Sequence, residues 1–106
     1  MIDLPGDLAE FFCIDWGGQL VTIDDDIDNE ILQIAAGGEN VWIGLRRDFD
    51  GNSWNWLGRS SNYRNWEDGE PNDLGGEDCV EMYDVGTWND LDCGSAKSYF
   101  CELSDP

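Results

Sequence analysis

Glu70-Pro71-Asn72, followed by Trp88-Asn89-Asp90 between Cys79 and Cys93, is the most informative stretch of this 106-residue chain. A further carboxylate, Glu77, lies between the two motifs. A hard divalent cation such as Ca²⁺ binds about six to eight oxygen atoms, and every polar residue in this stretch offers one. The spacing therefore predicts a calcium site made by the side chains of Glu70, Asn72, Glu77, Asn89 and Asp90.

The chain is strongly acidic, with 24 Asp and Glu against 5 Lys and Arg and a formal net charge of −19. This charge repels nucleic acid and anionic membrane, so neither is expected as a partner. Most of the carboxylates fit an ordinary solvated surface, so their placement, and not their number, points to calcium. Histidine is absent, which removes the commonest zinc ligand and the commonest general base. No apolar run approaches the roughly 20 residues that cross a bilayer, so no membrane insertion is expected.

The four cysteines, Cys13, Cys79, Cys93 and Cys101, predict two disulfide bonds. None belongs to a Cys-x-x-Cys pair, which disfavours zinc and thioredoxin-type chemistry. An even number of cysteines in so short a chain is typical of an oxidising compartment, and we expect a secreted or extracellular protein. Three pairings are open, because spacing alone does not choose among them.

Two helices are expected from capping residues and apolar spacing. The first spans residues 7–16, with Asp7 as its cap and an apolar face of Leu8, Phe11 and Phe12. The second spans residues 26–36 and follows an acidic run whose carboxylates suit a helix N-terminus better than a metal site. Its apolar positions at helical spacing are Ile27, Ile31 and Ile34.

Five strands are expected at 19–23, 41–45, 79–83, 86–90 and 99–103. Between the second and third strands, residues 46–78 lack periodicity and form a long loop, which in a compact domain is usually functional. Aromatic residues in this loop can give it a small core of its own, although tryptophans can also serve as platforms for sugars. The aromatic residues are Trp54, Trp56, Tyr63 and Trp66.

Five motifs in order, with all four cysteines in place, resemble the C-type lectin-like domain. These motifs span the chain from about Leu8 to Leu103 and are Cys13 with Gly-Gly-Gln-Leu-Val-Thr-Ile at 17–23, Trp42-Ile43-Gly44-Leu45, Glu70-Pro71-Asn72, Trp88-Asn89-Asp90 and Tyr99-Phe100-Cys101-Glu102. The resemblance implies one α+β domain over residues 1–106, with two short helices flanking small antiparallel sheets and a long calcium-binding loop. It also implies the disulfides Cys13–Cys101 and Cys79–Cys93, and a cis bond before Pro71, where a type I turn with a trans bond is the alternative.

The Glu-then-Asn order of residues 70–72 resembles the mannose-preferring lectins of that family. The resemblance implies that adjacent hydroxyls of mannose, N-acetylglucosamine or fucose complete the coordination of Ca²⁺. Each hydroxyl would donate to Glu70 or Glu77 and accept from Asn72 or Asn89. The expected function is calcium-dependent recognition of microbial or cell-surface glycans.

A second, auxiliary calcium site would use Asp73, Glu77 and Asp78, with Asp50 as the nearest acid from the segment after the second strand. In the matching register that segment offers Arg47 and Gly51, and Asp50 is out of register. The alternatives are that these acids are solvated, or that Arg46 or Arg47 supplies the positive charge of the ion.

The family's first strand has no clear counterpart here, because only residues 1–6 precede the first helix and Pro5 and Gly6 are poor strand residues. A missing or truncated strand would leave residues 99–103 with an unpaired edge, where a homo-oligomer could form.

Three other functions are alternatives on the same fold: ice binding through the calcium loop, protein binding in which calcium only orders the loop, and glycoside hydrolysis by Glu70 and Glu77. A catalytic acid needs an apolar pocket that raises its pKa, whereas acids crowded around a cation stay ionised. No enzymatic activity is therefore expected.

Overall fold

The computed structural model describes residues 3–51, 53–72 and 76–103, and strand β2 (Val41–Arg47) lies at its centre. Val41, Trp42, Ile43 and Leu45 are at most 2% exposed, as expected of a strand that is covered on both faces. The predicted strand at 41–45 is thus confirmed and continues through Arg47.

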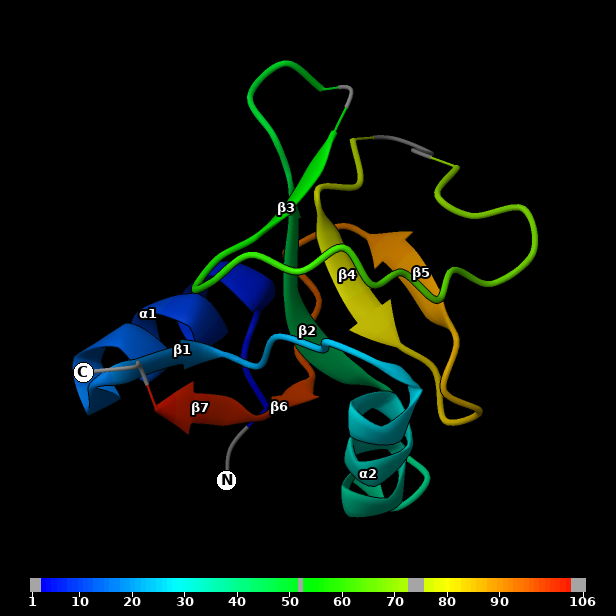
Figure 1. The fold of residues 1–106 in the computed structure, drawn as a ribbon. Helices are drawn as coiled ribbons and strands as arrows, with labels where there is room; N and C mark the ends of the chain where they lie inside the picture. Colours follow the sequence, from blue (N-terminus) through cyan, green and yellow to red (C-terminus); the bar gives the residue numbers. More distant parts are fainter. Residues whose placement is uncertain (1–2, 52, 73–75, 104–106) are drawn as a thin grey trace.

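A five-stranded sheet forms around β2 (Figure 1). Its order is β3 (Trp54–Trp56), β2, β4 (Cys79–Met82) and β5 (Trp88–Leu91), all antiparallel, and β6 (Ser98–Tyr99) pairs with β2 in parallel. A second, two-stranded sheet joins β1 (Gly18–Leu20) to β7 (Cys101–Leu103). The expected strand at 99–103 is therefore divided between two sheets, and the expected loop at 46–78 contains the strand β3.

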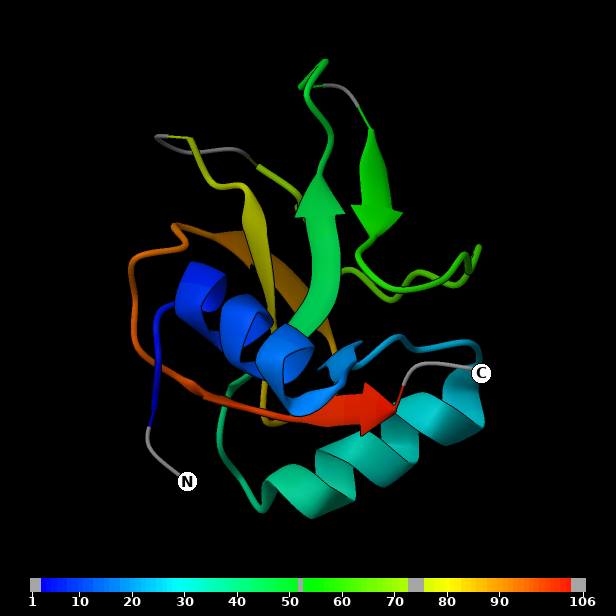
Figure 2. The ribbon, with the colours of Figure 1, turned by 90° about the vertical axis from the view of Figure 1, so that its left-hand side faces the viewer.

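Helix α1 (Gly6–Trp16) begins after Pro5, so the predicted cap at Asp7 is wrong. Proline suits a helix start because its φ is fixed and the missing N–H has no helical acceptor there. The predicted apolar face is also wrong, since Leu8, Phe11 and Phe12 are 49–67% exposed. The helix packs through Gly6, Ala9 and Cys13, and a Cβ on Gly6 would lie 2.9 Å from the Cys79 sulfur. Figure 2 shows α1 lying across one side of the large sheet.

Helix α2 (Asp26–Ala36) has the predicted bounds, and Asp25 caps it by accepting a hydrogen bond from the Asp28 backbone N–H over 2.8 Å. Its buried face is Asn29, Leu32 and Ala36. The predicted face of Ile27, Ile31 and Ile34 is wrong, because these side chains are 60–72% exposed. The buried hydrogen bonds of Asn29, described below, set the orientation of the helix.

Two disulfides, Cys13–Cys101 and Cys79–Cys93, join the elements in the pairing that the resemblance implies. The first connects α1 to β7, and the second connects β4 to the segment after β5. Before α1, Leu4 exchanges two backbone hydrogen bonds of 3.0 Å with Lys97. Within the described residues, β7 pairs with β1 alone, so dimerisation through its other edge stays a hypothesis.

The α+β arrangement with two helices and small, mainly antiparallel sheets agrees with the prediction. No described helix combines the length and the apolar character needed to cross a bilayer.

Candidate functional site

An aromatic cluster holds the long segment between β3 and β4. Trp88 is fully buried on β5, and the rings of Trp56, Tyr63 and Trp66 pack edge-on against it at centroid distances of 5.5, 5.6 and 6.1 Å. Trp54 packs against Trp66 at 5.2 Å. These tryptophans therefore form the interior of the loop, in agreement with the packing alternative.

Residues 65–67 run beside β5 and carry the Glu-Pro-Asn motif to it. Trp88 N–H donates to the Asn65 carbonyl over 2.9 Å, and Glu67 N–H donates to the Trp88 carbonyl over 2.8 Å. A turn follows, in which Glu70 N–H donates to the Glu67 carbonyl over 2.9 Å. Because this pairing fixes the register, Glu70 arrives next to Asp90, two residues beyond Trp88.

Glu70, Asn72 and Asp90 are in direct contact. The Glu70–Pro71 bond is cis. Asn72 donates its backbone N–H to Asp90 Oδ1 over 3.1 Å and its amide nitrogen to Glu70 Oε2 over 3.3 Å. Within the described residues, Glu70 Oε1 is buried without a hydrogen-bond donor.

The carboxylates of this cluster repel one another. Burial raises the pKa of Glu70, and the neighbouring carboxylates of Asp90 and then Glu77 add to the shift. Asp90 itself is completely buried, and its Oδ2 lies 3.5 Å from Arg47 Nη2. The cluster thus combines a fully buried carboxylate, that of Asp90, with the half-buried carboxylate of Glu70 next to it.

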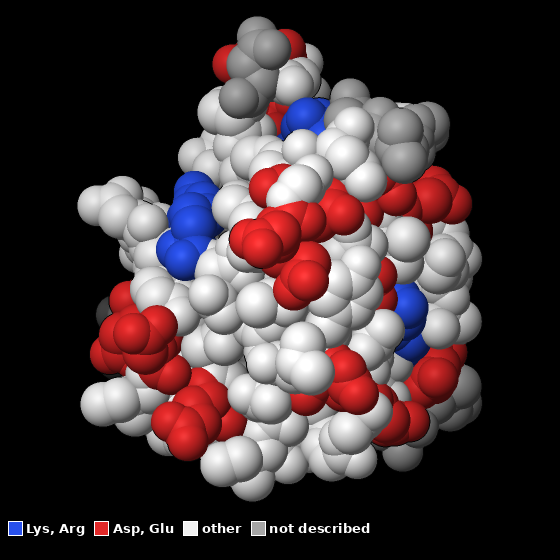
Figure 3. Space-filling view, turned by 90° about the vertical axis from the view of Figure 1, so that its right-hand side faces the viewer, with Lys and Arg blue, Asp and Glu red and all other residues white. Residues whose placement is uncertain are grey.

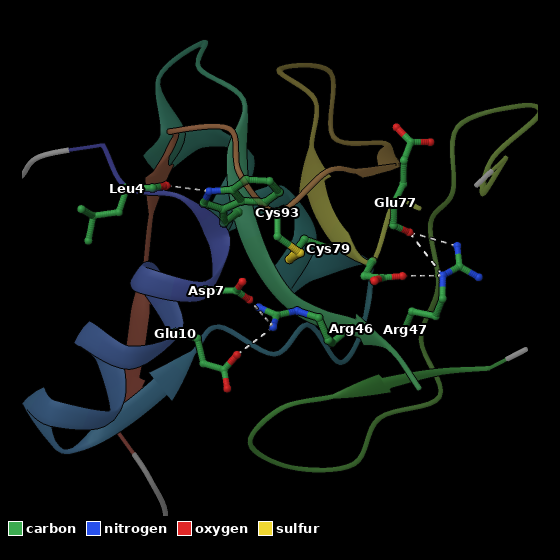
Figure 4. The surroundings of a disulfide bond; sticks show 10 residues. Leu4, Asp7, Glu10, Arg46, Arg47, Glu77, Cys79 and Cys93 are labelled. Atoms are coloured by element: carbon green, nitrogen blue, oxygen red, sulfur yellow. Dashed lines mark hydrogen bonds and ion pairs between the residues drawn. A yellow bond between two sulfur atoms is a disulfide. The ribbon is translucent and has the colours of Figure 1, made fainter. Parts of the chain in front are cut away.

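Glu77 and Asp78, in the segment that enters β4, contact Arg47, which in turn lies beside Asp90. The Glu77 carbonyl accepts from Arg47 Nη2 over 3.0 Å, while the Glu77 carboxylate points away from the guanidinium (Figure 4). Asp78 Oδ1 lies 3.1 Å from Arg47 Nε.

The auxiliary site, expected from Asp73, Glu77, Asp78 and Asp50, stays a prediction, because one of its residues is not described. Asp50 accepts from Ser53 Oγ at 3.4 Å within the β2–β3 turn, and Asp73 lies outside the described residues. Arg47 occupies the space beside Asp78, which agrees with the alternative in which an arginine supplies the charge.

Asn89 lies on β5 next to Asp90, and its amide nitrogen donates to Glu81 Oε2 over 2.9 Å. Glu81 is 4% exposed, and its other oxygen lies 3.0 Å from Lys97 Nζ. No motif in the sequence indicated this buried Asn89–Glu81–Lys97 chain. The predicted hairpin offered a signal for its first link, because a three-residue turn at 84–86 places Glu81 opposite Asn89.

Acidic side chains gather over the face that carries β5 and the long loop, with few basic residues among them (Figure 3).

Comparison with protein families matches residues 5–103 to the lectin C-type domain. The chain belongs to this family.

Curated relatives of this lectin domain agree with the assignment. A C-type lectin of Cerberus rynchops is 35% identical over 106 residues, which covers 89% of this chain and 67% of that protein. Collectin-10 of Gallus gallus is 39% identical over 102 residues, which covers 90% of this chain and 36% of that protein. C-type lectin domain family 17, member A of Homo sapiens is 36% identical over 98 residues, which covers 91% of this chain and 26% of that protein. The chain therefore spans between about a quarter and two thirds of these relatives.

Solved structures show the same fold. The carbohydrate-recognition domain of cow CD23, determined in the presence of a GlcNAc2Man3 oligosaccharide, has a TM-score of 0.86 at 34% identity, with 99% of this chain and 84% of that one covered. A calcium-independent type II antifreeze protein has a TM-score of 0.87 at 28% identity, covering 94% and 78%. The fold thus occurs both in a carbohydrate-recognition domain and in an ice-related protein without calcium, so the use of calcium has to be argued from the side chains.

The side chains at the site of this lectin domain fit a calcium ion. Carboxylate and amide oxygens are the ligands that hard cations prefer, and the cluster offers no nitrogen or sulfur ligand. Glu70 Oε1, which is buried and has no donor in the part of the chain that the structure describes, is an atom that a cation would satisfy. The raised pKa of Glu70 also favours a cation at this site, because a nearby positive charge would stabilise the ionised carboxylate.

Proposed function

We propose that this domain binds carbohydrate through a calcium ion. The ligands would be the side chains of Glu70, Asn72, Glu77, Asn89 and Asp90. The observation that carries the proposal is the contact of Glu70, Asn72 and Asp90 around a buried carboxylate oxygen that has no donor among residues 3–51, 53–72 and 76–103. When bound, the ion would offer open coordination positions to two adjacent hydroxyls of a sugar.

The protein side chains would orient those hydroxyls. Ionised Glu70 and Glu77 can only accept hydrogen bonds, and the amide nitrogens of Asn72 and Asn89 can only donate them. A hydroxyl does both, so it fits between a carboxylate and an amide. The Asn89 amide nitrogen donates one hydrogen to Glu81, so its second hydrogen would serve the sugar.

The Glu70-then-Asn72 order supports a preference for mannose, N-acetylglucosamine or fucose over galactose. The site is at the protein surface, so we expect a dissociation constant of about 1 mM for a single sugar, which corresponds to roughly 4 kcal/mol. Useful avidity on a microbial or cell-surface glycan would then require several copies of the domain. The two disulfides support action outside the cell.

Retention on mannose and galactose resins, with calcium and with excess chelator, tests the proposal. We expect retention on mannose with calcium, and release by chelator or by acid, because protons compete with the ion for the carboxylates. The double variant Glu70→Gln with Asn72→Asp should be retained less on mannose resin and more on galactose resin. Glu30→Gln, which changes an exposed acid on α2, should be retained as wild type is. Retention on mannose resin in chelator would refute the calcium-dependent mechanism. Calcium binding without retention on either resin would favour a protein-binding use.

A further inference from the structure

Arg47, the last residue of β2, lies largely buried beside Asp90 of the proposed calcium site. Its side chain is 12% exposed and its guanidinium stacks on the Trp54 ring at 4.4 Å from the ring centroid. Three of its contacts are acceptors from the site: the Glu77 carbonyl at 3.0 Å, Asp78 Oδ1 at 3.1 Å and Asp90 Oδ2 at 3.5 Å. The Gly51 carbonyl accepts from Nη1 over 3.0 Å.

The acceptors that surround this guanidinium are of the kind that binds calcium. Two carboxylate oxygens and two backbone carbonyls are hard oxygen ligands, and they come from three separate segments of the chain. Arginine is suited to such a position because its charge is permanent and its donors form a rigid planar fork. A metal ion at the same place would meet a fixed positive charge, which disfavours its binding.

Arg47 also acts on the ligand Asp90. The two oxygens of this buried carboxylate have different partners, with Oδ2 directed to Arg47 and Oδ1 accepting from the Asn72 backbone. Holding one oxygen fixes the rotation of the carboxylate, and so fixes the oxygen that faces Asn72 and Glu70.

The neighbouring Arg46 has no such role. It lies 3.2 Å from Asp7 and 2.9 Å from Glu10, both of α1, and Figure 4 shows the two arginines directed to different partners. A substitution of Arg46 thus removes an arginine from the same strand without altering the cluster, which makes it a matched control.

We propose that Arg47 is a positioning residue that serves as a built-in cation, taking the place of a second calcium ion and limiting the domain to one. This inference rests on the proposed calcium site. The carboxylates of Asp78 and Asp90 carry two negative charges beside Arg47, which offsets one of them. Without Arg47, a second ion would complete the neutralisation and would find its oxygen ligands already gathered.

Calorimetric titration with calcium, together with thermal unfolding in chelator, tests this in the oxidised protein. Wild type should bind one ion. Arg47→Glu, which adds a carboxylate in place of the cation, should bind two. Arg47→Gln should melt at a lower temperature than wild type in chelator and gain more from calcium, whereas Arg47→Lys should keep a stoichiometry of one and recover part of the loss. Arg46→Gln should match wild type in stoichiometry and in the gain from calcium.

Each outcome separates the two proposals. A wild type that binds no calcium would remove the proposed function and this inference with it. A wild type that binds one ion, with Arg47→Glu also binding one and Arg47→Gln gaining no more from calcium than wild type, would overturn the inference and leave the proposed function standing. A wild type that binds two ions would do the same. If Arg47→Glu does not fold, the comparison of Arg47→Gln with Arg47→Lys decides, because only the charge-conserving variant should recover stability in chelator.

Discussion

Glu70→Gln should change the stability of the domain in opposite directions with and without calcium. In chelator, the half-buried Glu70 carboxylate faces Asp90, and its buried Oε1 has no donor among the described residues. An unpaired buried acceptor costs about 1–3 kcal/mol, and the lower end applies to a half-buried side chain. Glutamine has the same shape and no charge, so the variant should be more stable than wild type by about 1 kcal/mol, or roughly 4–8 °C in melting temperature.

Calcium should reverse the order. Calcium sites of extracellular modules have dissociation constants of about 0.1–1 mM, so about 10 mM calcium stabilises the wild type by roughly 1.4–2.7 kcal/mol. For a domain of this size that is a rise of about 6–20 °C. Loss of a residue that merely supports a metal ligand weakens binding about 10–100-fold, and loss of a direct ligand should cost at least as much. Most of the calcium-induced rise should therefore be absent from Glu70→Gln.

The stability of the calcium-free wild type should fall with rising pH, which also favours Glu70→Gln over wild type in chelator. Because the folded-state pKa of Glu70 is raised, its protonated form stabilises the calcium-free fold. That contribution is fully present below the ordinary range of a glutamate and is lost as pH rises through the raised pKa. The advantage of Glu70→Gln in chelator should consequently grow with pH over this window.

Melting curves by circular dichroism, in chelator, calcium and magnesium, provide the measurement. Glu30→Gln on α2 is the matched control, since it removes the same charge from an exposed position away from the site. If wild type and Glu70→Gln gain equally from calcium, Glu70 is not a ligand. If the variant is the less stable protein in chelator, the reasoning from the undonated oxygen is wrong.

Two further predictions concern the aromatic cluster and its neighbours. Burial, and then a hydrogen bond to an α2 carboxylate, raise the pKa of Tyr63 to about 12, so stability from this group is complete below about pH 10 and is lost as pH rises to about 12. Burial raises the pKa of Tyr83 as well, so phenolate absorbance should show late titration by both residues, and Tyr63→Phe should remove the share of Tyr63 alone. Asn29 accepts from Trp88 Nε1 over 2.9 Å and donates to the Gly86 carbonyl over 2.8 Å, both in the interior. Asn29→Ala should cost about 2–4 kcal/mol in urea unfolding, and a loss below 1 kcal/mol would show that water replaces both bonds.

Helical spacing in the sequence predicted where the helices lie but not which face each one buries. In α2, Ile27, Ile31 and Ile34 satisfy helical periodicity, yet the buried face centres on Asn29. A polar side chain was preferred there because its two bonds join the helix to Trp88 and to the turn before β5. Such partners come from residues more than fifty positions away, and no local pattern contains them.

The missed strand β3 has a different explanation. Trp54-Asn55-Trp56 does alternate in the manner of a strand, but its neighbours are glycine, asparagine and serine, which are typical of loops. Pairing with the end of β2 stabilises these three residues. Because a strand this short depends on its partner, the sequence around it could not establish it.

The sequence predicted the oxygen-bearing residues of the candidate site better than it predicted the role of Arg47 beside them. Side-chain oxygens at motif spacing indicate an ion, and Glu70, Asn72 and Asp90 do meet in the structure. The contribution of Arg47 depends on the twist and length of β2, which carry the guanidinium past the strand end to Asp78 and Asp90. Sequence register alone named Arg47 only as one of several alternatives.

The placement of the site on β5 explains how the mutually repelling carboxylates of Glu70 and Asp90 can be kept together. The backbone bonds of residues 65–67 to Trp88, and the rings packed around Trp88, fix the approach of Glu70 to Asp90 without any help from charge. The aromatic cluster therefore supplies the free energy that holds the acids at short range, and Arg47 offsets part of their repulsion. An ion that binds this group need not organise the loop, so more of its binding free energy is available for affinity.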